Sequence, residues 1–93
     1  MPLRVAVIGV GHLGRHHARI LSALPGATLV GVVDVNQARA EEIAAGANTR
    51  AVVHADDLLG VVDAVTVAVP TERHLEVALP FLRAGISVLV GGI

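Results

Sequence analysis

Gly9-Val10-Gly11-His12-Leu13-Gly14 is a G-x-G-x-x-G sequence that joins two segments of different pattern. Leu3–Gly9 is a short apolar run rich in Val and Ile, which is typical of a strand buried on both faces. Leu13–Leu24 has apolar residues close to a 3.6-residue period, which predicts a helix. Pro25-Gly26 is expected to end that helix. The hexapeptide is therefore predicted to be a turn between a buried strand and a helix.

Each glycine of this turn has a different predicted task. Gly9 permits a tight turn, Gly11 lets the backbone approach a pyrophosphate, and Gly14 lets the helix pack against the strand. The free N–H groups and the positive dipole end of the helix favour an anion, so His12 and Leu13 belong to the same predicted phosphate site. The spacing alone is weak evidence. The strand before it and the helix after it are the context that supports a dinucleotide site.

Asp34 lies at the end of the second apolar run, 20 residues after Gly14. At that distance a carboxylate is placed to accept hydrogen bonds from the adenosine ribose hydroxyls. The same carboxylate would repel a 2′-phosphate, so the predicted cofactor is NAD rather than NADP. Arg39 lies five positions further on and softens that preference. The alternative is a chance glycine loop followed by a turn aspartate.

Apolar runs alternate with helix-period segments along the whole chain, which predicts crossover connections and a parallel sheet. The predicted fold is a single doubly wound α/β domain of Rossmann type over residues 1–93, with five strands in the order 3-2-1-4-5. Asn36 and Thr71 are expected to cap the second and the last helix. The expected strands are 3–9, 27–35, 50–53, 61–69 and 86–90, and the expected helical segments are 13–24, 37–45, 56–59 and 71–84.

Composition narrows the possible functions. The chain is 54% hydrophobic and 16% charged, with a formal net charge of −1, so it is expected to collapse rather than to be disordered. The 7 basic residues do not exceed the 8 acidic ones, and Phe81 is the one aromatic residue. A nucleic-acid partner is therefore not expected, because both the electrostatic and the stacking contributions are missing.

The sequence contains no cysteine, which excludes disulfides and thiolate metal sites. No apolar run reaches the roughly 18 residues of a membrane span, and no signal-peptide pattern opens the chain. A cytoplasmic protein without a membrane partner is the expectation.

Three histidines are candidates for chemistry. His12 and His16 have the i, i+4 spacing of some zinc sites, but no third ligand is apparent nearby, so no metal site is predicted. His74 has an imidazole suited to proton transfer near neutral pH, and its alternative is an ordinary residue in the first turn of a helix. No catalytic residue is assigned.

Several separated motifs resemble the Gfo/Idh/MocA oxidoreductases, the relatives of glucose–fructose oxidoreductase and inositol dehydrogenase. They are Val5–Ala18 around the glycine turn, Val32-Val33-Asp34, Ala68–His74 and Ala84–Val90. The resemblance covers essentially the whole chain and implies a nicotinamide-binding domain. It also implies that Pro70, Thr71 and His74 line the nicotinamide side of the cleft.

The C-terminal residues depart from the family pattern. After a segment such as Val88-Leu89-Val90 the family usually reads Glu-Lys-Pro, with the lysine near substrate and nicotinamide, whereas this chain reads Gly91-Gly92-Ile93 and has no lysine. The resemblance also implies a second, substrate-binding domain, and we expect the 93-residue chain to be the cofactor domain without it. The expected function is the NAD-binding domain of an oxidoreductase for a sugar, cyclitol or nucleotide sugar, inactive as this isolated chain. The alternative is a truncated or engineered fragment that folds and self-associates without useful cofactor binding.

The last expected strand, Ile86–Val90, is apolar and lies at an edge of the predicted sheet. An edge strand presents unpaired backbone groups that another chain can pair with. Self-association through residues 80–93 is therefore expected.

Overall fold

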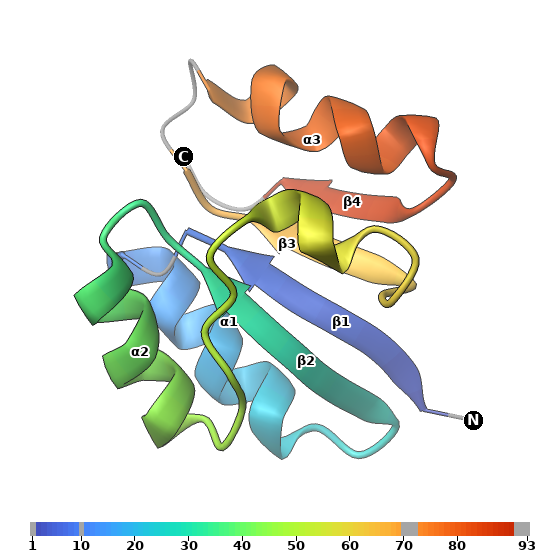
Figure 1. The fold of residues 1–93 in the computed structure, drawn as a ribbon. Helices are drawn as coiled ribbons and strands as arrows, with labels where there is room; N and C mark the ends of the chain where they lie inside the picture. The colour runs from blue at the N-terminus through green and yellow to red at the C-terminus, as the bar shows by residue number, and fades with distance from the viewer. Residues whose placement is uncertain (1, 10, 70–72, 91–93) are drawn as a thin grey trace.

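The computed structural model describes residues 2–9, 11–69 and 73–90, with only the backbone described at His12, Leu13, His74 and Val90. Figure 1 shows a sheet with helices packed against it. The elements in chain order are β1 (Leu3–Ile8), α1 (His12–Ala23), β2 (Ala27–Val33), α2 (Gln37–Gly46), the 3-10 helix η1 (Ala55–Leu58), β3 (Ala64–Val67), α3 (His74–Arg83) and β4 (Ser87–Val90).

The strands form one parallel sheet in the order β2-β1-β3-β4. The α/β fold of Rossmann type and the parallel sheet are confirmed, and these four strands keep their expected relative order. The prediction of a fifth strand is wrong for the part of the chain that the structure describes. Residues 50–53 run beside β2 as expected, but they form an isolated bridge, Val32 with Ala51, rather than a strand.

Within the described residues, segment 50–53 shares backbone hydrogen bonds with β2 only at Val32, so it forms a bridge and not a strand. Val32 donates to the carbonyl oxygen of Arg50 at 3.0 Å and accepts from the N–H of Val52 at 2.8 Å. Val53, the next apolar residue, is 62% exposed. Because Val53 is not buried, no burial of its side chain favours further backbone pairing beyond this bridge.

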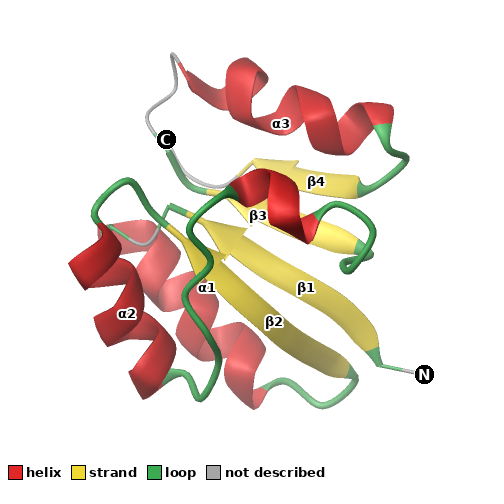
Figure 2. Cartoon of the chain, viewed as in Figure 1, coloured by secondary structure: helices red, strands yellow, loops and turns green. Residues whose placement is uncertain are grey.

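Each face of the sheet has its own apolar core, because successive strand side chains point to opposite faces. Helices α1 and α2 cover one face, while α3 and η1 cover the other (Figure 2). The buried residues of the first core are Val7, Ala18, Val32, Ala40, Ala44 and Ala47. Those of the second are Ala6, Ile8, Val33, Val52, Leu58, Val62, Val65, Val67, Phe81 and Ile86.

Local signals explain where the helices begin and end. The side chain of Asn36 accepts a hydrogen bond from the N–H of Arg39 at 3.1 Å, which confirms the predicted cap of α2. Gly85, with a φ of 77°, follows α3 in the left-handed region that glycine adopts readily. The predicted cap Thr71 lies outside the described residues, and α3 begins at His74 rather than at 71.

Arg4 and Asp63 join the amino ends of β1 and β3. Asp63 accepts from the backbone N–H of Arg4 at 2.8 Å, from its Nε at 3.2 Å and from its Nη2 at 3.0 Å. In return the N–H of Asp63 donates to the carbonyl oxygen of Arg4 at 2.7 Å. The side-chain hydrogen bond, helped by the backbone one and by opposite charge, lowers the pKa of Asp63 and raises that of Arg4.

Asp63 is expected to make the domain less stable in acid. Because folding lowers the pKa of Asp63 below the ordinary 3.8, the folded chain binds fewer protons than the unfolded chain at pH values around and below 3.8. The stabilisation is complete well above pH 3.8 and is lost as the pH falls through the lower pKa of the folded state. Thermal unfolding followed by circular dichroism, from about pH 7 to about pH 2, should show a smaller acid-induced fall in Tm for Asp63→Asn than for the wild type.

The matched control is Asp57→Asn, because Asp57 is an exposed aspartate on η1. The same acid dependence in Asp63→Asn and the wild type would contradict the assigned role of the Arg4–Asp63 pair.

Candidate functional site

The turn after β1 lies where the carboxyl ends of three strands meet. The N–H of Gly9 donates to the carbonyl oxygen of Val33 at the end of β2, at 2.6 Å. The N–H of Ala68, just after β3, donates to the carbonyl oxygen of Ile8 at 2.8 Å. Gly9 has a φ of 90°, and a Cβ there would lie 2.8 Å from the carbonyl oxygen of Ala68. Both the backbone conformation and the space therefore require glycine at this position.

The other two glycines of the turn have opposite surroundings. A Cβ on Gly14 would overlap the carbonyl oxygen of Gly9, so α1 can approach the turn only because residue 14 has no side chain. Among the atoms that the structure describes, a Cβ on Gly11 would meet only the Nη1 atom of Arg39, at 3.9 Å, which is an ordinary contact. Gly14 is thus required for packing, whereas the space beside Gly11 is open on the protein side.

The start of α1 differs from the start of α2. Gly11 is the residue before α1 and has no side chain with which to cap the helix, whereas Asn36 caps α2 through its side chain. No acidic residue lies in the first turn of α1. The positive end of the α1 dipole is therefore not compensated by a carboxylate of its own first turn, which leaves it suited to an anionic ligand.

Asp34 follows β2 directly and is partly buried. Its Oδ1 accepts a hydrogen bond from the N–H of Asn36 at 2.8 Å, which fixes the side chain next to its own backbone. An ionised carboxylate has about four lone-pair sites, so it can accept more than one hydrogen bond. Asp34 is held at the end of the sheet where Gly9 also lies.

These residues line one cleft of about 470 Å³. Small-molecule sites in proteins span about 300–1,000 Å³, so the cleft has a suitable size. It lies at the carboxyl ends of the parallel strands, which is where ligands bind in open α/β sheets. The lining residues are Ile8, Gly9, Gly11, Val33, Asp34, Val35, Arg39, Ala55, Asp56, Ala68, Val69, Arg73, Glu76, Val77, Pro80 and Phe81.

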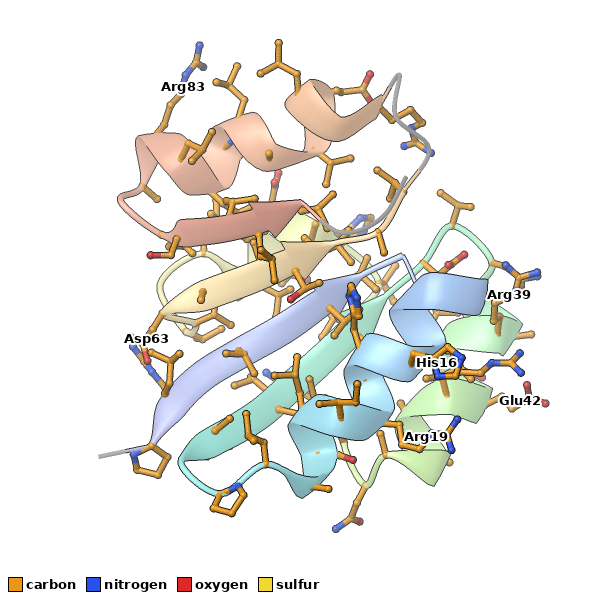
Figure 3. The ribbon with its side chains drawn as sticks, turned by 180° about the vertical axis from the view of Figure 1, so that it is seen from behind. His16, Arg19, Arg39, Glu42, Asp63 and Arg83 are labelled. Atoms are coloured by element: carbon orange, nitrogen blue, oxygen red, sulfur yellow. The ribbon has the colours of Figure 1, made fainter. Side chains whose placement is uncertain are left out.

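Charges of both signs surround an apolar interior. Arg39 on α2 lies at the glycine-turn end of the molecule, far from Asp63 at the other end of the strands (Figure 3). Across the cleft, Nη2 of Arg73 lies 3.8 Å from Oε1 of Glu76 on α3, an exposed pair that contributes little to stability. Arg39 is the lining cation beside the open space at Gly11.

Four of the residues that the sequence singled out line this cleft, namely Gly9, Gly11, Asp34 and Arg39. Gly14 lies behind the turn and positions it. His12, Leu13 and His74 belong to α1 and α3 by their backbone, and their side chains lie outside what the structure describes. Pro70 and Thr71 also lie outside the described residues.

Sequence reasoning missed the wall of the cleft that is opposite Asp34. For Asp56 of η1 the sequence predicts only the start of the helical segment 56–59, and for Glu76 and Val77 of α3 it predicts no more than helix. Val35 also lines the cleft and is 86% exposed, whereas the sequence placed it inside the expected strand 27–35 and gave no sign of that exposure.

Among residues 2–9, 11–69 and 73–90, no group of three or more His, Cys, Asp or Glu side chains is placed to hold a metal ion. Within the same ranges, every helix is too short or too polar to cross a bilayer.

Comparison with known proteins gives a family match along nearly the whole chain. The Gfo/Idh/MocA family model, described as an oxidoreductase family with an NAD-binding Rossmann fold, matches residues 3–91. UDP-N-acetylglucosamine 3-dehydrogenase of Acidithiobacillus ferrooxidans is 46% identical over 88 residues, which are 95% of this chain and 28% of that enzyme. Inositol 2-dehydrogenase 1 of Saccharopolyspora erythraea is 43% identical over 94 residues, covering 96% of this chain and 28% of that enzyme.

Solved structures give the same result. A crystal structure of the A. ferrooxidans UDP-N-acetylglucosamine 3-dehydrogenase superposes with a TM-score of 0.89 at 45% identity, over 96% of this chain and 29% of that one. GenD2 from gentamicin A biosynthesis, in complex with NAD, superposes with a TM-score of 0.88 at 34% identity, over 94% of this chain and 26% of that one.

The chain spans little more than a quarter of the length of these relatives. The match nevertheless includes the glycine turn, Asp34 and every described strand. The chain therefore belongs to the Gfo/Idh/MocA oxidoreductase family, of which it forms an NAD-binding Rossmann-fold segment.

Proposed function

We propose that this chain holds NAD, in preference to NADP, in the cleft between Gly9 and Asp34, and that it does not catalyse a reaction as an isolated chain. The observation that carries the proposal is the single cleft lined by Gly9, Gly11, Asp34 and Arg39, which are up to 30 positions apart in the sequence. A turn, an open position, a carboxylate and a cation at one end of a parallel sheet match the parts of a dinucleotide.

The shape of the site supports this assignment. The space beside Gly11 admits a phosphate close to the backbone, and the uncompensated start of α1 lies next to it. Asp34 accepts hydrogen bonds from the ribose hydroxyls, while Val35 and Val69 offer apolar surface to the adenine. When bound, the nicotinamide supplies hydride transfer, and the protein supplies binding and orientation.

The parent activity we propose is oxidation of a hydroxyl group on a sugar, cyclitol or nucleotide sugar. The names of the relatives support this class, since they are dehydrogenases of UDP-N-acetylglucosamine and of inositol. The chain has no lysine at the position where the resemblance expects one. The described part of the cleft also offers no histidine side chain as a proton acceptor. Binding without turnover is therefore the proposal for the 93-residue chain.

Titration calorimetry with NAD tests the proposal, and Asp34→Ala tests the site. Wild-type chain should bind NAD, and Asp34→Ala should weaken binding by about 10- to 100-fold, because a hydrogen bond to a charged group contributes about 1.5–3 kcal/mol. Asp57→Ala is the control, because it removes an exposed aspartate from η1. No heat of binding in the wild type would reject the proposed function. Equal NAD affinity in the wild type and in Asp34→Ala would reject only the role of Asp34.

Arg39 is expected to decide how well NADP is accepted once Asp34 is removed. Asp34→Ser removes the charge that repels a 2′-phosphate and should raise the NADP to NAD affinity ratio by roughly tenfold or more. Adding Arg39→Ala should cancel most of that gain, because Arg39 lies beside the open space at Gly11. The wild type, Asp34→Ser and the double variant Asp34→Ser/Arg39→Ala are compared by competition against NAD, and a gain that persists without Arg39 would contradict this role.

Gly11 and Gly14 are expected to respond oppositely to the same added methyl group. Gly11 has a φ of −68° and room for a Cβ, so Gly11→Ala should keep its Tm and lose NAD affinity at least about tenfold. Gly14→Ala forces α1 away from Gly9 and should lower stability by about 1–3 kcal/mol or more. Thermal unfolding and NAD titration of both variants measure the difference. Unchanged NAD binding in a folded Gly11→Ala would show that the phosphates lie elsewhere.

A further inference from the structure

A second, smaller groove of about 210 Å³ lies between α1 and α2. No described residue lines both this groove and the cleft at the carboxyl ends of the strands, so the two are separate. Two arginines of α1 form one wall, and residues of α2 and of its C-terminal end form the other. The lining residues are Arg15, Arg19, Glu42, Ile43, Gly46 and Ala47.

The arginine wall has no compensating charge on its own helix. Arg15 and Arg19 are four residues apart on α1, so their side chains lie on the same side of the helix, and α1 contains no acidic residue. Both arginines are exposed, and no ion pair within the described part of the chain engages either guanidinium group. Like charges at this spacing destabilise a helix. An anion in the groove would relieve that repulsion.

Glu42 gives the opposite wall a negative group. It lies on α2, the helix next to the one that carries Arg19 (Figure 3). Among the described residues, its carboxylate forms no ion pair with Arg15 or Arg19, so the groove is not closed by a salt bridge. A carboxylate accepts hydrogen bonds from hydroxyl groups. The groove therefore suits a ligand that is anionic at one end and carries hydroxyl groups at the other.

Gly46 lines the groove although neither the backbone nor the packing requires glycine there. It is the last residue of α2, and glycine is a poorer helix former than alanine. The left-handed conformation after the helix is adopted by Asn48, with a φ of 57°, and not by Gly46. A Cβ on Gly46 would meet none of the described atoms within 4 Å. Its missing side chain leaves space in the groove that alanine would occupy.

We propose that this groove binds a small phosphorylated polyol, with its phosphate group held by Arg15 and Arg19. Guanidinium groups match the geometry of phosphate oxygens. Two of them balance the charge of a phosphate monoester, about −1.5 to −2 at neutral pH, whereas a single carboxylate would balance one. Glu42 accepts hydrogen bonds from the hydroxyl groups and disfavours inorganic phosphate by repulsion. The proposal is independent of NAD binding, because the two linings are separate.

NMR titration of the isotope-labelled 93-residue chain with glycerol 3-phosphate locates the site. Saturable shifts are expected at the amides of Arg15, Arg19 and Gly46, at millimolar concentrations because exposed ion pairs are weak. Glycerol should produce no such shifts, and inorganic phosphate should bind more weakly than glycerol 3-phosphate. Shifts confined to Gly9 and Gly11, or no saturation, would overturn the proposal. Equal binding of inorganic phosphate would overturn the assignment of a polyol.

Arg19→Gln tests the arginine wall. It should weaken glycerol 3-phosphate binding by about three- to tenfold, because one charged hydrogen-bond donor is lost. Arg83→Gln is the matched control, since Arg83 is an exposed arginine on α3 at the opposite end of the molecule from Arg19 (Figure 3). Its affinity should equal that of the wild type. An equal loss in both variants would show that general charge, rather than the groove, attracts the phosphate.

Gly46→Ala separates binding from folding. Alanine should raise Tm, because it favours the helix and meets no described atom. The same methyl group should weaken glycerol 3-phosphate binding, because it occupies the groove. Circular dichroism melting and the NMR titration measure the two effects. A stabilised Gly46→Ala variant with unchanged affinity would contradict the placement of the ligand beside residue 46.

Discussion

The contact between Gly9 and Gly14 is the constraint on which the rest of the structure depends. The carbonyl oxygen of Gly9 occupies the place that a Cβ of residue 14 would need, and Gly9 itself is pressed against the carbonyl oxygen of Ala68. Only residues without a side chain fit at positions 9 and 14, and this allows α1 to follow β1 after a short turn. Because α1 begins so close to the sheet, the space beside Gly11 stays open in front of the first helical amides. The candidate site is therefore a by-product of a packing requirement.

In this parallel sheet, the residues of the cleft and the Arg4–Asp63 pair lie at opposite ends of the strands. All four strands run in the same direction, so their carboxyl ends gather the glycine turn, Asp34 and the residues of α3 at one end. The amino ends are joined by Arg4 and Asp63, far from the cleft (Figure 3). Because the two sets of polar groups do not share partners, changes at one end are expected to leave the other nearly unaffected. The cleft can then vary in charge without loss of the fold.

At the β2 edge of the sheet, a short segment covers the strand without forming a strand itself. Residues 49–52 cover the edge of β2 with only one bridge and one threonine hydroxyl, yet this is enough to occupy the outward groups of Leu29 and Val32. This segment overlaps residues 50–53, which the sequence predicted as a strand and the structure shows as an isolated bridge. Its apolar residues signalled proximity to the sheet correctly, but they did not reveal that a single residue, Val32, takes both of its backbone bonds. A hydrophobic run predicts burial, whereas a strand requires repeated backbone pairing.

The sequence alone determined the alternation of strands and helices, the glycine turn, the cap at Asn36 and the position of Asp34. Each of these depends on residues close together in the chain, through apolar period, turn chemistry and missing side chains. The tertiary structure decided that η1 and α3 form the far wall of the cleft. It also decided that the described strands pair in the order β2-β1-β3-β4. These features depend on distances between segments far apart in the chain, and local pattern contains no information about which surfaces meet.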